Sequence, residues 1–155
     1  MKPGNVFKYE NRLAKNALGG GGMTAAEALK SAHAAVEQVR DPTLAAIDEN
    51  LREIYALAET LKTAAEFDEA SLQRMYVCSN QVVATGGVFG LAELGQAAYS
   101  LCELVSRFQT LERFQAKLVQ VHIDGLRLLR APADHSAEHR EAVLKGLRMV
   151  ATSVV

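Results

Sequence analysis

The chain has 155 residues, of which 49% are hydrophobic and 23% are charged, and its formal net charge is −1. This length predicts one domain with a substantial core, and the near-neutral charge gives no electrostatic reason to expect nucleic acid or a membrane as a partner. No apolar run approaches the ~20 residues of a membrane span, and the N-terminus lacks the apolar region of a secretory signal, so we expect a cytoplasmic protein.

The composition favours an all-α protein, and the first residues differ from the rest. Three prolines, no tryptophan and abundant alanine, leucine and glutamate are typical of helical domains. Residues 1–22 form a mildly basic tail that ends in four glycines, a composition typical of linkers. We expect residues 23–155 to form a single helical-bundle domain.

The first two helices are predicted from a cap and a proline. Thr24 is followed three residues later by Glu27, the pattern of a capping box, which predicts a helix over 25–39. Asp41-Pro42 predicts an interruption, because proline disfavours helix in the residue before it and is accepted at a first helical position. A second helix is expected over 43–65.

Four further helices follow with short links. The first has Asp68 as its expected cap, and Ser136 is the expected cap of the last. Their expected ranges are 68–85, 91–108, 112–130 and 137 to the C-terminus. Short links between long helices predict an up-and-down four-helix bundle, with its core at about 43–130 and with additional N- and C-terminal helices.

The stretch from 80 to 94 carries a resemblance to a known family. It contains Phe89-Gly90 and then Leu91-Ala92-Glu93-Leu94 at the start of a helix. The stretch resembles the centre of a histidine phosphotransfer (HPt) domain, the four-helix module that passes phosphoryl groups to response-regulator receiver domains. That family has a histidine ten residues before this glycine, a lysine three residues after the histidine, and a glycine one residue later.

Counting back from Gly90 places Asn80 at the phosphohistidine position, Val83 at the lysine position and Ala84 at the glycine position. An imidazole is nucleophilic near neutral pH. The amide nitrogen of asparagine has no basic site, and valine offers no positive charge to a phosphate. The resemblance therefore implies a degenerate HPt member with no catalytic residue, and we expect no enzymatic activity.

The resemblance also implies a partner surface around Asn80. Residues three and four positions apart share a helix face. Small residues on that face let a partner approach the helix backbone. An uncharged face suits contact with the apolar helix face of a receiver, unless Val77 and Val83 turn inward. The implied partner is a response-regulator receiver domain or a histidine kinase, bound without phosphate transfer. The implied surface residues are Gln73, Tyr76, Val77, Asn80, Val83, Ala84 and Gly87.

Another histidine, His122, leaves active phosphotransfer open as an alternative. The apolar stripe of its helix is expected at Phe114, Leu118, Val121, Gly125 and Leu128 or Leu129. His122 lies at the edge of this stripe, which favours a core histidine held by hydrogen bonds. A helical scaffold or homodimer with no phosphorelay role also stays open. A third open alternative is a phosphatase that acts on a receiver and uses the acid of Glu69 and the amide of Gln73.

We expect no metal and no cofactor. His135 and His139 have a metal-compatible spacing, but no carboxylate or thiol set converges with them. Cys78 and Cys102 have no metal-binding spacing and lie on apolar helix faces, which predicts buried free thiols. The sequence contains no nucleophile elbow, phosphate loop or dinucleotide fingerprint.

Overall fold

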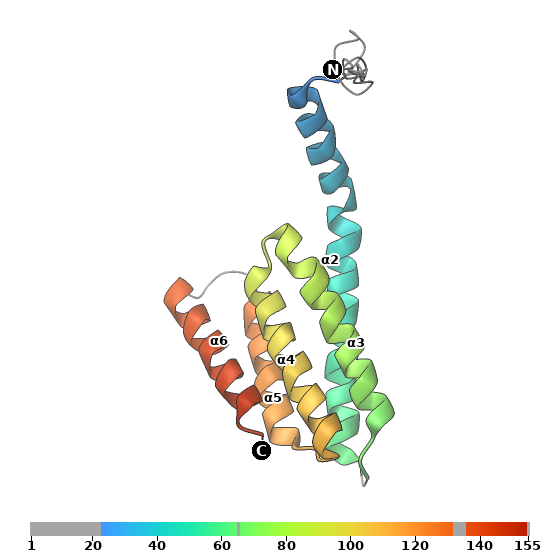
Figure 1. Cartoon of the computed structure of the whole chain (residues 1–155), viewed down its shortest axis with the longest axis vertical. Coiled ribbons are helices and arrows are strands. Elements are labelled where there is room, and N and C mark those ends of the chain that lie inside the picture. Colours follow the sequence, from blue (N-terminus) through green and yellow to red (C-terminus); the bar gives the residue numbers. More distant parts are fainter. Residues whose placement is uncertain (1–22, 65, 132–135, 155) are drawn as a thin grey trace, which may run out of the picture. The chain divides into compact units, whose positions relative to one another are not determined.

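The structure is a computed structural model and describes residues 23–64, 66–131 and 136–154. The basic, glycine-rich segment 1–22 lies outside the described residues. Every secondary-structure element of the described residues is a helix and none is a strand, which confirms the all-α prediction. Its elements are α2 (Ala25–Thr63), α3 (Glu69–Gly86), the 3-10 helix η1 (Gly87–Phe89), α4 (Ala92–Leu111), α5 (Ala116–Arg130) and α6 (Ala137–Thr152) (Figure 1).

The expected interruption at Asp41-Pro42 is wrong, because α2 continues through Pro42. The N-terminal helix expected over 25–39 is therefore the first part of α2 rather than a separate element. Proline removes one backbone donor and leaves the carbonyl of Gln38 without its helical partner. Pro42 and Gln38 are both exposed, so water can hydrate that carbonyl, and the flanking residues are mostly good helix formers.

The start of α2 follows the predicted capping box. The backbone N–H of Glu27 donates to Thr24 Oγ1 at 3.2 Å, and the backbone N–H of Thr24 donates to Glu27 Oε2 at 2.8 Å. These bonds hold the pKa of Glu27 below its ordinary value, since they favour the ionised carboxylate. The reciprocal pair satisfies two backbone donors that a helix start otherwise leaves unpaired.

The chain divides into two compact units, residues 1–39 and 40–155. The described part of the first unit, 23–39, is exposed at every residue. The second unit contains the hydrophobic core. No helix among the described residues combines the length and the apolar character needed to cross a lipid bilayer.

Within the second unit, successive helices run in opposite directions, and α4 packs against α3, α5 and α6 (Figure 1). Each helix contributes side chains with at most 2% of their surface exposed, for example Ile54, Leu72, Leu101, Leu126 and Leu147. Burial of one such side chain contributes about 1.5–3 kcal/mol. The hydrophobic effect therefore holds five helical segments around one core.

Ion pairs join neighbouring helices at the edge of this core. Arg130 of α5 donates from Nε and Nη2 to the two carboxylate oxygens of Asp48 on α2, at 2.7 and 2.9 Å. Arg140 of α6 pairs with Glu93 of α4. Partly exposed pairs of this kind contribute at most about 1 kcal/mol each, so they orient the helices more than they stabilise them.

The buried face of α5 differs from the expected stripe. Val121 is 44% exposed, whereas Val119, Ile123 and Leu126 are buried. The expected burial of Leu129 and Gly125 is confirmed. Leucine, valine and isoleucine occur on several sides of this helix, so the spacing of apolar residues did not select one face.

The contact between α3 and α4 leaves little room at Gly86. A Cβ atom added there would lie 3.0 Å from the carbonyl oxygen of Leu91 and 3.4 Å from the backbone nitrogen of Gly95. At the adjacent Gly87, an added Cβ would meet nothing within 4 Å. The two neighbouring glycines therefore form a matched pair for substitution.

We expect Gly86→Ala to lower the free energy of unfolding by about 1–3 kcal/mol, since the new methyl group presses on backbone atoms that cannot rotate away. Gly87→Ala is the control, and it should leave stability unchanged or raise it by up to about 1 kcal/mol. Urea unfolding of the three proteins measures both effects. Equal stabilities of the two variants would contradict the close approach of α3 and α4.

Candidate functional site

Helix α3 presents the face around Asn80. Its start is fixed by Asp68, whose Oδ1 accepts from the backbone N–H of Ser71 at 2.9 Å, as predicted for this cap. Leu72, Met75 and Val82 are fully buried and fix the rotation of the helix against the core. That rotation leaves Asn80 exposed.

The seven residues expected at the partner surface are the Asn80 face: Gln73, Tyr76, Val77, Asn80, Val83, Ala84 and Gly87. Four of them are exposed, namely Gln73, Asn80, Ala84 and Gly87. Tyr76, Val77 and Val83 are half-buried, so the two valines are neither fully exposed nor turned completely inward. The side chain of Gln73 accepts a hydrogen bond from Gln109 on α4 at 3.0 Å, so its amide is engaged.

The link after α3 depends on Gly90. Its φ of 77° and ψ of 13° lie in the left-handed region, which glycine adopts without steric cost. The N–H of Leu91 then donates to the carbonyl of Gly86 at 2.9 Å, and the N–H of Gly95 donates to the carbonyl of Leu91 at 3.0 Å. These bonds turn the chain back so that α4 lies along α3.

A groove with two hollows runs between α3 and α4, which we call the α3–α4 groove. The larger hollow has a volume of about 540 Å³ and is lined by residues of α3, η1, α4 and α6, including Val83, Gly87 and Arg148. The smaller one has about 320 Å³ and is lined by Tyr76, Cys102, Ser106 and Arg107, among others. Tyr99 and Glu103 line both hollows, so the two lie next to each other along α4.

Asn80 lies beside this groove without lining it. It follows Tyr76 by one helical turn and precedes Val83 by nearly one turn, so it shares a helix face with both. Tyr76 lines the smaller hollow and Val83 the larger. The Asn80 face and the α3–α4 groove therefore form adjoining parts of one surface.

The expected surface omitted the α4 and α6 side of this groove. Gln96, Tyr99, Glu103 and Arg107 lie three or four residues apart on α4, so helical spacing alone places them on one face. The contribution of Arg148 depends on how α6 packs against α4, which no local pattern in the sequence specifies. Its Nη2 donates to Oε1 of Gln96 at 2.6 Å.

His122 is fully buried between α4 and α5, which confirms the prediction of a core histidine. Nδ1 lies 2.9 Å from the carbonyl oxygen of Leu118, and a carbonyl only accepts, so Nδ1 carries the proton. Nε2 then accepts from the hydroxyl of Ser100 at 3.0 Å. Burial lowers the pKa of His122, although the bond to Leu118 partly opposes this. Neither ring nitrogen is open to a phosphate donor at the surface.

The two cysteines are buried free thiols, as predicted. Burial raises the pKa of Cys78 and of Cys102 to about 11 in each case. The reactive thiolate is therefore scarce at neutral pH. The described residues contain no group of three or more histidine, cysteine, aspartate or glutamate side chains that could hold a metal ion, and His135 lies outside them.

Comparison of the chain with known protein families, curated proteins and solved structures found no match. The resemblance to HPt domains therefore rests on the residues of the stretch 80–94 alone.

The buried His122 makes stability depend on pH. We expect the free energy of unfolding to fall as the pH drops below about 6.5, the ordinary pKa of histidine, because the unfolded chain then binds a proton that the folded chain does not. The loss of stability ends once the pH is below the lowered pKa that His122 has in the folded chain. Urea unfolding at about pH 7.5 and about pH 5.5 measures the change in the free energy of unfolding.

His122→Gln is the control for this prediction. The carboxylates of Glu53 and Asp68, whose pKa values are lowered by hydrogen bonds to Arg74 and Ser71 respectively, also reduce stability in acid, but equally in both proteins. The difference between wild type and variant therefore isolates the histidine. An equal loss in the two proteins would show that His122 is not held neutral by the fold.

Proposed function

We propose that this chain is an HPt-like signalling protein that binds a response-regulator receiver domain or a histidine kinase without relaying phosphate. The observation that carries the proposal is the exposed position of Asn80 on α3, ten residues before the left-handed Gly90. HPt domains present their histidine at this position of the motif. We interpret the second part of α2 with α3, α4 and α5 as the HPt-like core, and α6 as an addition.

The shape of the Asn80 face supports binding to a flat partner surface. Ala84 and Gly87 are exposed and have little or no side chain, so a partner can approach the backbone of α3. None of the seven residues of the face carries a charge at neutral pH, and the half-buried Val77 and Val83 add apolar area. Such a face suits a partner helix with apolar side chains.

The chemistry of the face supports binding without transfer. The amide of Asn80 has no basic nitrogen to accept a phosphoryl group, and His122, the alternative considered above, is enclosed in the core. Receivers and histidine kinases act in the cytoplasm, which is the location that this proposal implies. The protein would compete for a receiver or kinase rather than serve as a step in phosphate transfer.

Binding to a panel of receiver domains tests the proposal directly. Each receiver is titrated free and loaded with beryllofluoride, which mimics the phosphorylated state. We expect saturable binding to one or two receivers, and we expect Ala84→Arg to weaken it at least tenfold because the long side chain blocks approach to α3. No binding to any receiver or kinase would contradict the proposal.

Ala142→Arg is the matched control for this titration. Ala142 is an exposed alanine on α6 and lies outside both the Asn80 face and the α3–α4 groove. The same substitution there should leave the affinity within about twofold of wild type. Equal losses from the two variants would show that the Asn80 face is not the contact surface.

Restoring the HPt motif tests the assignment of Asn80. The triple variant Asn80→His, Val83→Lys and Ala84→Gly should accept phosphate from a phosphorylated receiver that the wild type binds, because it regains a basic nitrogen and a cation beside it. Acid-labile labelling with radioactive phosphate measures transfer, and the wild type should remain unlabelled.

The added substitution His122→Gln should leave the labelling of this triple variant intact. A folded triple variant that binds the receiver and takes no phosphate would show that Asn80 does not occupy the phosphohistidine position.

A further inference from the structure

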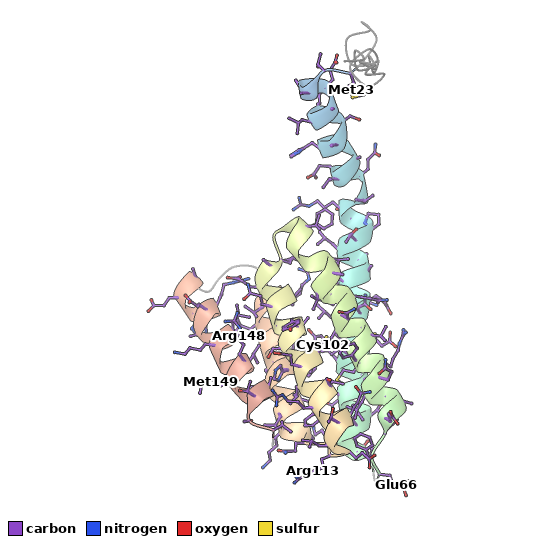
Figure 2. All side chains as sticks on the ribbon, in the orientation of Figure 1. Met23, Glu66, Cys102, Arg113, Arg148 and Met149 are labelled. Atoms are coloured by element: carbon purple, nitrogen blue, oxygen red, sulfur yellow. The ribbon has the colours of Figure 1, made fainter. Side chains whose placement is uncertain are left out.

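The α3–α4 groove has a positive charge at each end. Arg107 of α4 lines the smaller hollow, and Arg148 of α6 lines the larger one. Both residues are exposed. Figure 2 shows Arg148 on the side of α6 that faces α4, in agreement with its hydrogen bond to Gln96.

Neither arginine is neutralised among the residues that the structure describes. Arg148 donates from its side chain to the amide oxygen of Gln96, which carries no charge, and Arg107 makes no ion pair with a described carboxylate. By contrast, Arg74, Arg130 and Arg140 all pair with a carboxylate on a neighbouring helix. Arg107 and Arg148 are therefore available to an outside anion.

The only acidic residue lining the groove is Glu103, which is half-buried and borders both hollows. Two cations and one anion leave the groove with a net charge of +1, opposite in sign to the −1 of the whole chain. Guanidinium groups bind carboxylates and phosphates in bidentate geometry. The net positive charge of the groove therefore favours an acidic occupant.

We infer that Arg107 and Arg148 select a partner by binding acidic side chains that enter the two ends of the α3–α4 groove. The inference rests on the proposed function, because the occupant is part of the same receiver or kinase that covers the adjoining Asn80 face. Val83 cannot supply the cation that an HPt lysine offers, and the two arginines place positive charge beside that face from α4 and α6 instead. Helix α6, which lies outside the HPt-like core, thus contributes a residue that determines specificity.

Charge-neutralising variants test the inference with the receiver that binds best in the panel. Arg107→Gln and Arg148→Gln should each weaken binding about three- to tenfold, and they should reduce the loss of affinity that added salt causes in the wild type. Glu103→Gln should tighten binding about two- to threefold, because it removes a carboxylate that repels the acidic occupant. Isothermal titration at about 50 and 300 mM salt measures all three.

Arg113→Gln is the matched control for charge. Arg113 is exposed, forms no ion pair with a described residue and lies in the link between α4 and α5, outside the groove lining (Figure 2). This variant should bind within about twofold of wild type. A uniform loss in all three arginine variants would overturn the inference, because it would reflect overall charge rather than the groove.

The outcomes separate this inference from the proposed function. Binding that Ala84→Arg abolishes but that the groove variants leave unchanged would overturn the inference and leave the proposed function standing. Weaker binding by Glu103→Gln with tighter binding by the two groove arginine variants would show a basic occupant and would also overturn it. No binding of the wild type to any receiver or kinase would overturn both.

Discussion

The close approach of α3 and α4 is the constraint on which the rest of the structure depends. Gly86 lies against the backbone of Leu91 and Gly95, and Gly90 supplies the left-handed conformation that turns the chain. Bulkier residues at these points would separate the two helices or prevent the turn. The approach brings the exposed stripe of α4 beside the Asn80 face, so one surface contains both the uncharged face and the charged groove.

Much of this architecture follows from local sequence signals. The caps at Thr24, Asp68 and Ser136 each form the side-chain hydrogen bond to a backbone N–H that their residue types predict. Such signals work because they involve residues three positions apart and need no knowledge of the tertiary fold. The apolar spacing of Leu72, Met75 and Val82 likewise defines the buried face of α3, and Asn80 lies outside that face.

Other features depend on opposing energetic contributions or on tertiary packing, which local sequence patterns do not resolve. Pro42 was expected to end a helix, but its cost is one hydrogen bond at an exposed site, and the helix-forming residues on both sides outweigh it. The register of α5 was ambiguous because Leu118, Val119 and Val121 are all apolar and only packing decides among them. The same holds for Arg148, whose place in the groove depends on where α6 packs.

Under the proposed function, the asparagine at position 80 affects more than the capacity for phosphate transfer. A histidine there would gain charge as the pH falls through about 6.5, so the binding energy of the face would vary within the physiological range. The amide of asparagine does not ionise in this range. Under the proposed function, contact at the Asn80 face would depend on shape and apolar area, while the charges of Arg107 and Arg148 would supply the electrostatic selection inferred above. A partner would then be distinguished by its charge without making the contact itself sensitive to pH.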